Sequence, residues 1–441
     1  MTTLLAERKA DERPPTQTPS GTQRFMSVDA LRGFDMFWII GADSLVYALH
    51  SLSPNRPTEF LADQLEHAEW AGFHFYDLIF PLFVFLVGVS IVFSLTKALD
   101  AGGRAEAVKR VVRRGVLLYV VGLFYSGGFS HPWPDLRLLG VLNRIALAYL
   151  FAGLLFCFFK PRSLAIICGS LLVGYWALMT FVPIRDIQLT RPNIAQLAEK
   201  AGDAATADYF KDRSSPNPST VKNSPAWAGA EKLFYGTTNY VTGRYAKGYN
   251  LSDHFDFQYL PGKKYDTFFD PEGYLSTLPA IASCLLGVFA GLLLRNQTVS
   301  GEKKVLYLIS CGVSSVVAGW CWHLQFPVTK KIWTSSFVLV AGGYSAILLS
   351  VFYMIVDVWQ KRAWCQPFVW MGMNSITIYL ASNIIGGFRS IAPRLVGGDV
   401  RTFLDTHVAR GFGQLVISLV GLLLALWFVH FLYKRKIFLR I

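Results

Sequence analysis

The chain has 441 residues, of which 53% are hydrophobic and only 16% carry a formal charge. The apolar residues are gathered in blocks of about 20, the length that an α-helix needs to cross the hydrocarbon core of a bilayer, so the composition excludes an ordinary soluble enzyme. The formal net charge of +13 comes without any compact basic motif interleaved with aromatic residues. It therefore indicates membrane topology and contact with anionic lipid head groups, and no nucleic-acid partner is expected.

The first 24 residues are polar and contain Pro14, Pro15 and Pro19. A secretory signal peptide needs an apolar centre, which residues 1–24 lack, so we interpret them as a disordered cytoplasmic tail. The first apolar block, from Val28 onward, then acts as an uncleaved signal anchor.

Ten apolar blocks are each expected to form a transmembrane helix. Gly122, Gly127 and Gly128 interrupt the third block, and Asn374 and Asn383 lie within the ninth. The sequence predicts an all-α polytopic membrane protein with two five-helix halves, residues 25–183 and 273–441. The blocks are centred near residues 38, 86, 118, 150, 173, 285, 313, 345, 377 and 422.

One long connection, residues 184–272, joins the two halves and is rich in Asn, Ser, Pro, Gly and Tyr. A structureless loop of this length would be unusual inside a folded protein. We therefore expect a small extracytoplasmic cap of short helices and turns over the membrane body.

Basic residues are distributed unevenly between the two sides of the membrane. With a cytoplasmic amino terminus, the inward-facing segments hold most of the Lys and Arg, as the positive-inside rule requires. We therefore expect a multi-pass protein of the cell inner (plasma) membrane with both termini cytoplasmic. The inward residues are Lys97, Arg104, Lys109, Arg110, Arg113, Arg114, Lys160, Arg162, Arg295, Lys303, Lys304, Lys361, Arg362, Lys434, Arg435, Lys436 and Arg440, and those of the short outward loops are Arg56, Arg137, Lys330, Lys331, Arg389, Arg394, Arg401 and Arg410.

A polar segment with two histidines, His67 and His74, ends at Asp77 and meets an apolar run without charge from Leu78 to Thr96. This pattern holds groups capable of proton transfer at a membrane surface. An interfacial loop anchored by aromatic residues, Trp70 and Tyr76, explains the same pattern without any chemistry.

The first apolar block carries charged residues that a membrane helix rarely tolerates. Asp29 and Arg32 are three residues apart, so they share a helix face and can form a structural ion pair or contact a ligand. Asp43 lies eleven residues beyond Arg32, about 16 Å further along a helix, which places it near the outer end. Asp43 is therefore expected to converge with His67, His74 and Asp77, where a carboxylate would orient an imidazole for general-base chemistry.

All six cysteines lie within the apolar blocks or at an inner loop, and the sequence contains no CxxC pair and no Cys/His cluster. We expect no metal site, and we interpret the cysteines as small residues that pack between helices. They are Cys157, Cys168, Cys284, Cys311, Cys321 and Cys365.

Eight motifs follow one another from residue 27 to the end of the chain: Ser27–Gly33, His67–Gly88, Gly140–Arg144, Asp270–Thr277, Leu286-Gly287 with Ala290-Gly291, Phe326–Trp333, Gly372–Ser375 and Tyr433–Ile441. In this order they resemble the catalytic region of the heparan-α-glucosaminide N-acetyltransferase family. The resemblance implies the ten-helix body of the bacterial members, without the lumenal domain and leading helix of the lysosomal enzyme. It also implies transfer of an acetyl group from cytoplasmic acetyl-CoA across the membrane to an amino sugar.

The resemblance also implies roles for particular residues. His67 matches the histidine to which the family assigns catalysis, as general base or acetyl carrier. Asp43 stands where the lysosomal enzyme has an asparagine, and Ser382 and Asn383 replace a His-Glu pair. The expected set is His67, Asp43 and Asn374 for catalysis, with Asn374 as oxyanion donor; Arg32, Arg113 and Arg114 for acetyl-CoA; and Asp77, Arg144 and Glu272 for the acceptor.

Other interpretations remain for parts of this picture. Positive-inside anchoring explains Arg113 and Arg114 more simply than contact with acetyl-CoA does. Polar residues within ten helices would also suit an amino-sugar transporter with Asp43 and Asp77 as proton or substrate sites, although the two halves show no internal repeat. A non-catalytic scaffold is a third possibility. Membrane lipids are expected partners, and relatives suggest a homodimer.

Overall fold

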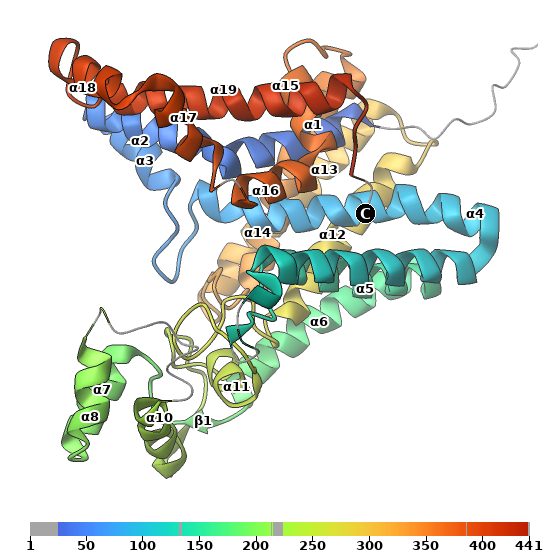
Figure 1. The fold of residues 1–441 in the computed structure, drawn as a ribbon. Helices are drawn as coiled ribbons and strands as arrows, with labels where there is room; N and C mark the ends of the chain where they lie inside the picture. Colours follow the sequence, from blue (N-terminus) through green and yellow to red (C-terminus); the bar gives the residue numbers. More distant parts are fainter. Residues whose placement is uncertain are drawn as a thin grey trace, which may run out of the picture.

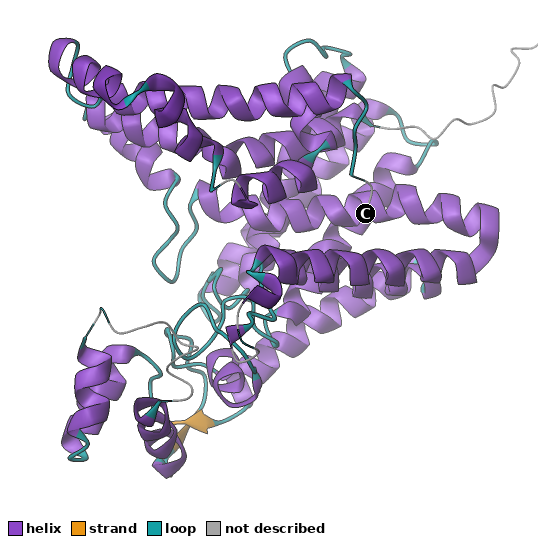
Figure 2. Cartoon of the chain, in the orientation of Figure 1, coloured by secondary structure: helices purple, strands orange, loops and turns teal. Residues whose placement is uncertain are grey.

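The computed structural model describes residues 25–439 except 131, 133–134, 213, 215–223 and 385. The cytoplasmic tail expected over residues 1–24 lies outside these residues. The described part is almost entirely helical, with one pair of two-residue strands beside the short helices of the connection (Figure 2). The all-α fold class is confirmed.

Seven helices in the described part are long and apolar enough to cross a membrane, which defines a polytopic membrane protein. The longest contains the second and third predicted blocks, because Gly103, with φ of 73°, turns the chain between two helical arms. Eight of the ten blocks are thus found in α4 (Phe75–Tyr125), α5 (Val141–Phe158), α6 (Pro161–Phe181), α12 (Thr277–Arg295), α13 (Gly301–His323), α14 (Ser335–Tyr353) and α19 (Phe412–Lys434).

The first and ninth blocks are divided into shorter helices. In the first, α1 (Met26–Phe37) passes through a π-helical segment (Trp38–Ala42) into α2 (Asp43–Leu52), and Gly41 has a φ of 142° that a side chain would strain. In the ninth, Asn374 separates α15 (Gln366–Met373) from α16 (Ser375–Ile384). Irregular backbone at membrane depth is tolerated where protein or a cavity surrounds it, so these breaks are candidate places for a site. The remaining short helices of the membrane body are α3 (Arg56–Gln64), α17 (Phe388–Val396) and α18 (Gly398–His407).

Glycines allow two pairs of helices to touch backbone to backbone. A Cβ on Gly33 of α1 would lie 1.7 Å from the Phe368 carbonyl oxygen of α15, and one on Gly372 would lie 1.8 Å from that of Asp29. The crossing of α4 and α12 is similar, since a Cβ on Gly88 would lie 1.9 Å from a backbone oxygen of α12. Small residues drive this close packing in membranes, where lipid provides no hydrophobic force between helices.

The connection between α6 and α12 folds into short elements around its own apolar core, which includes Phe210, Trp227, Phe234 and Phe257. We call residues 184–272 the cap. The strands β1 (Ile184–Arg185) and β2 (Tyr240–Val241) pair antiparallel. Its helices are α7 (Arg191–Lys200), α8 (Ala204–Lys211), α10 (Pro225–Gly236) and α11 (Leu251–Tyr259).

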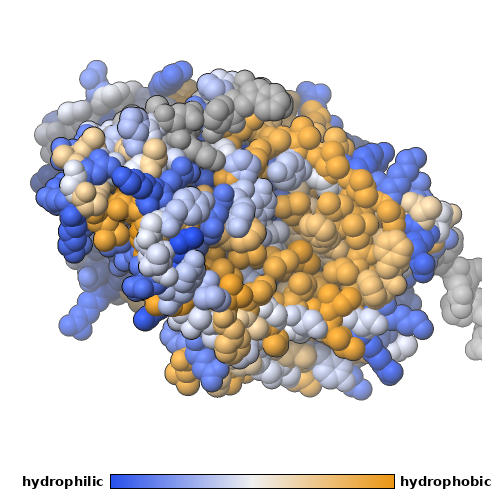
Figure 3. Space-filling view, turned by 90° about the horizontal axis from the view of Figure 1, so that it is seen from below, coloured by the Kyte–Doolittle hydropathy of each residue, from blue (hydrophilic) through white to orange (hydrophobic). Residues whose placement is uncertain are grey.

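The cap and α3 lie at one end of the long helices, and the turn of α4 at Gly103 lies at the opposite end (Figure 1). A broad apolar surface occupies the region between the two hydrophilic ends (Figure 3). Exposed apolar side chains such as Val116, Phe151 and Ile166 belong to the helices of this body. The cap is therefore on the side opposite the basic segment that follows Gly103, as expected; which side is cytoplasmic stays a prediction.

Candidate active site

His67 is held by a buried carboxylate at the start of α4. Its Nδ1 lies 2.8 Å from Oδ1 of Asp77, whose side chain is only 1% exposed, whereas that of His67 is 48% exposed. The other carboxylate oxygen, Oδ2, accepts the backbone N–H groups of Ala68 and His74, each at 3.1 Å. Asp77 thus orients the imidazole with Nδ1 as donor, which leaves Nε2 available as the proton acceptor.

The aromatic residues of the polar segment do not act as simple bilayer anchors. The indole of Trp70 donates to the carbonyl oxygen of Tyr245 in the cap at 2.7 Å. The ring of Tyr76 lies 5.0 Å from that of His67. The loop that carries His67 is therefore fixed between α4 and the cap.

Asp43 does not pair with His67, contrary to the expectation from helix length. Its Oδ1 accepts the backbone N–H of Ser44 at 2.7 Å and the Ser44 hydroxyl at 3.1 Å. The imidazole of His74 does not contact His67 either, since its Nδ1 donates to the carbonyl oxygen of Glu66 at 3.1 Å, and His74 contacts Asp77 only through its backbone N–H. The expectation assumed a straight helix from Arg32 to Asp43, and the strained Gly41 breaks it.

Lys330 lies beside His67 and was interpreted from the sequence only as an outward-facing loop charge. Its Nζ is 3.1 Å from Nδ1 and 3.3 Å from Nε2 of His67, and 3.5 Å from Oδ1 of Asp77. A nitrogen almost equidistant from both ring nitrogens would collide with Cε1 in the ring plane, so Nζ lies over the face of the imidazole. The only sequence signal was the place of Lys330 in the Phe326–Trp333 motif.

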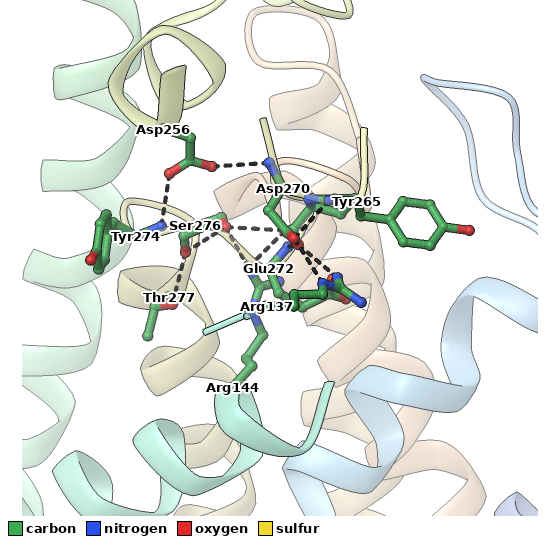
Figure 4. Close-up of polar contacts among 11 residues, drawn as sticks. Arg137, Arg144, Asp256, Tyr265, Asp270, Glu272, Tyr274, Ser276 and Thr277 are labelled. Atoms are coloured by element: carbon green, nitrogen blue, oxygen red, sulfur yellow. Dashed lines mark hydrogen bonds and ion pairs between the residues drawn. The ribbon is translucent and has the colours of Figure 1, made fainter. Parts of the chain in front are cut away.

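A second polar group is built on Arg137, whose guanidinium binds two carboxylates (Figure 4). Its Nε and one terminal nitrogen contact the Asp270 carboxylate at 2.8 and 2.7 Å, and that terminal nitrogen also lies 2.7 Å from Oε2 of Glu272. Burial, together with the neighbouring Asp270 carboxylate, raises the pKa of Glu272 to about 7. Arg137 and Asp270 were not among the expected site residues.

Arg144 contacts the chain segment that follows Asp270. It is buried on α5 and donates to the carbonyl oxygen of Pro271 at 2.7 Å and to the Ser276 hydroxyl. Its guanidinium also lies over the Trp333 ring, 4.8 Å from the centroid. These contacts place Arg144 as a support for the segment that carries Glu272, as Figure 4 shows.

These groups line one cavity of about 520 Å³, which we call the His67 cavity. Aromatic side chains, among them Phe80, Trp333 and Tyr379, form much of its apolar wall. A concave apolar site with a few convergent polar groups is the usual form of a small-molecule site. Its polar lining includes His67, Asp77, Arg137, Arg144, Glu272, Lys330 and Lys331.

A smaller cavity of about 120 Å³ lies next to it, and we call it the Arg114 cavity. It is lined by Arg32, Arg114 and Asn374, whereas Arg113 is exposed and lines neither cavity. Ser382 and Asn383 also line neither. The two cavities share part of their walls and are therefore neighbours within the bundle. The shared residues are Phe83, Leu142, Ile145, Ser375 and Ile376.

The polar residues of the Arg114 cavity are only partly paired within the bundle. Arg32 donates to the Ser90 hydroxyl at 2.8 Å and lies 3.4 Å from Asp29, so the expected ion pair is present. Asn374 donates to the carbonyl oxygen of Trp370 at 3.2 Å, and its own Oδ1 is buried without a hydrogen-bond partner. Asn374 therefore lies in the neighbouring cavity and not beside His67. Among the described residues, no group of three or more His, Cys, Asp or Glu side chains could hold a metal ion.

Fold and site together define a polytopic membrane protein with a histidine–carboxylate pair facing a cavity inside its helix bundle. Residues 24–211 match the family described as heparan-alpha-glucosaminide N-acetyltransferase, catalytic. The family resemblance expected from the motifs is thus confirmed.

Two curated relatives extend the similarity beyond the matched region. The chain is 26% identical to heparan-alpha-glucosaminide N-acetyltransferase of Mus musculus over 98% of its own length and 62% of the mouse protein. It is 25% identical to that of Homo sapiens over 85% of its own length and 56% of the human protein. The chain therefore spans about six tenths of the length of these relatives.

Proposed function

We propose that this protein is a transmembrane acetyltransferase that moves an acetyl group from acetyl-CoA to the amine of an amino sugar. The observation that carries the proposal is the His67–Asp77 pair, which faces a cavity that shares part of its wall with a second, arginine-lined cavity inside the bundle. Similarity to the two N-acetyltransferases supports the reaction class.

His67 acts as the general base. An amine attacks a thioester through its lone pair, so a proton has to leave the nitrogen during the reaction, and Nε2 of His67 accepts it. Asp77 stabilises the resulting imidazolium through the 2.8 Å contact with Nδ1. A base oriented by a third group is the arrangement that activates nucleophiles in many enzymes.

The donor approaches through the Arg114 cavity. A volume of about 120 Å³ is too small for a nucleotide and holds only the narrow acetylated end of the pantetheine arm, so the phosphates would stay outside near Arg114. The shared wall at Phe83, Ile145 and Ser375 is where the acetyl end enters the His67 cavity. With the basic segment after Gly103 in the cytoplasm, donor and acceptor are on opposite sides of the membrane.

The acceptor occupies the His67 cavity. Glu272 and Arg137 offer charged partners for the amine and hydroxyl groups of a sugar, and aromatic side chains such as Trp333 and Tyr379 offer apolar faces for its ring. Because Glu272 is already paired with Arg137, its role is to position the acceptor.

An amino-sugar transporter is the alternative, and the presence of two neighbouring cavities inside the bundle is the observation that favours it. Purified protein in lipid nanodiscs would be given labelled acetyl-CoA and a panel of amino sugars, and proteoliposomes would be tested for uptake of the same sugars. Acetylation that requires His67 supports the transferase. Uptake without acetylation contradicts it and supports the transporter.

A further inference from the structure

The ammonium group of Lys330 lies at the reacting end of the His67 cavity, and the reaction described above does not use it. The side chain is 20% exposed and belongs to the loop between α13 and α14. Burial lowers the pKa of Lys330, and the Asp77 carboxylate opposes this effect. The loop is rigid where it carries Lys330, because the Thr334 hydroxyl accepts the backbone N–H of Thr329 at 3.0 Å.

A role as a counter-ion for Asp77 does not account for the position of Lys330. The Asp77 carboxylate already has His67 and two backbone N–H groups as partners. Nζ of Lys330 lies closer to both imidazole nitrogens, at 3.1 and 3.3 Å, than to the carboxylate, at 3.5 Å. A cation placed over the ring of a base destabilises the imidazolium that forms when the base accepts a proton. The position of Lys330 therefore indicates a separate function in the reaction.

Acyl transfer produces a negative charge that a nearby cation can stabilise. The amine nitrogen forms a bond to the thioester carbon, the C=O π pair moves onto oxygen, and one N–H proton passes to His67. The C–S bond then breaks with its electron pair on sulfur, the carbonyl reforms, and the thiolate takes the proton from His67. Between these two events the oxygen carries a full negative charge, which an enzyme stabilises with donors fixed in advance.

We propose that the Lys330 ammonium is the donor that binds the oxyanion of this tetrahedral intermediate. The inference rests on the proposed acetyl transfer and goes beyond it by assigning a residue to a separate task. Nζ is 3.3 Å from Nε2, the atom that receives the proton, so one reacting centre can contact both groups. Asn374, the donor expected from the sequence, lines the neighbouring cavity instead.

The test compares Lys330→Met, Lys330→Gln and Lys330→Ala in the full-length protein. The matched control is Lys211→Met in the cap, where Lys211 forms an exposed ion pair with Glu199 at 3.1 Å. Lys330→Met should lower kcat by about 100- to 1,000-fold, the effect of losing one oxyanion donor, with little change in KM for acetyl-CoA. Lys330→Gln, which keeps a donor, should retain more activity than Lys330→Met. Methylammonium should partly restore Lys330→Ala, because its cation fits the space that the side chain leaves.

The possible results separate the role of Lys330 from the proposed function. Wild-type acetylation with near-normal kcat in Lys330→Met overturns the role of Lys330 and leaves the proposed function intact. So does a loss of activity that Lys330→Gln and Lys330→Met share equally and that methylammonium does not restore, since this marks a purely structural lysine. Absence of acetylation by the wild-type protein overturns the proposed function and the role of Lys330 together.

Discussion

The backbone N–H of Gly72 donates to the carbonyl oxygen of Val328 at 2.9 Å, which joins the loop of His67 directly to the loop of Lys330. Gly72 has a φ of 132°, a conformation that a side chain would strain. Two segments more than 250 residues apart in the chain are thereby held in one fixed arrangement around Asp77. The candidate base and the cation over its ring are therefore positioned together.

Replacing His67 should abolish most of the activity and leave the fold intact. Its side chain is half-exposed, so His67→Ala removes little packing, whereas loss of a general base lowers kcat by roughly a hundredfold or more. Steady-state kinetics with labelled acetyl-CoA measure this effect, and His407→Ala in the exposed helix α18 is the control. Near-normal turnover in His67→Ala would exclude His67 as the base.

The two candidate partners of His67 can be separated by matched substitutions. Asp77→Asn should shift the pH profile of kcat and lower its maximum, because an amide does not stabilise an imidazolium as a carboxylate does. Asp43→Asn should leave the profile unchanged, since within the described part of the chain the hydrogen bonds of Asp43 go to Ser44. A shift in Asp43→Asn without one in Asp77→Asn would reverse this assignment.

The buried Glu272 should make stability depend on pH in a defined direction. The pKa of this carboxyl is raised to about 7 in the folded protein, from its ordinary value of about 4.5. The folded state thus keeps a proton that the unfolded chain releases, so the free energy of unfolding should fall as pH rises from about 4.5 to about 7 and then level off. Thermal unfolding in detergent measures this dependence. Glu272→Gln should weaken it, and Glu199→Gln in the cap should not.

Gly273 should tolerate no side chain. A Cβ there would lie 1.8 Å from Oδ2 of Asp256, which accepts the backbone N–H of Asp270 at 3.4 Å, while Oδ1 accepts that of Tyr274 at 3.1 Å. Gly273→Ala should displace the segment that carries Glu272 and lower kcat/KM for the acceptor by at least about tenfold, the factor that corresponds to 1.4 kcal/mol. Gly236→Ala, where a Cβ meets nothing within 4 Å, is the control. Equal kinetics in both variants would contradict the prediction.

The sidedness of the membrane can be tested with single cysteines in a cysteine-free background. Ser53 near α3 and Ala201 in the cap should react with an impermeant thiol reagent on intact cells, and Ala105 after the α4 turn should not. All three residues are exposed in the structure. Labelling of Ala105 alone would place the His67 cavity on the cytoplasmic side and exclude acetyl transfer in the proposed direction.

The sequence was sufficient to predict the helical body, because hydropathy over about 20 residues is a local property. It was also sufficient for the Asp29–Arg32 pair, which depends only on helical spacing. The carboxylate partner of His67 could not be predicted from helical spacing. Helical spacing places Asp43 near the outer end, but the non-helical backbone of Gly41 lies between Arg32 and Asp43, and only the folded structure shows that the Asp43 carboxylate binds Ser44.

Arg137 and Lys330 show that contacts between distant segments could not be predicted from the sequence. In the sequence both look like charges in short outward loops, a pattern that solvation and topology explain. Their importance comes from contacts with Asp270 and Asp77, which lie 133 and 253 positions away. No local pattern encodes such pairings, because several distant segments have to fold before the charges meet.

The backbone contact of Gly33 with Gly372 also determines how the Arg114 cavity responds to substitution. Either glycine replaced by alanine adds a single methyl group that meets a backbone oxygen at less than 2 Å, so α1 and α15 have to separate. Arg32 directly precedes one of these glycines, and Asn374 lies two residues after the other. A substitution that touches no proposed reacting group should therefore distort the Arg114 cavity and lower activity, as loss of His67 should.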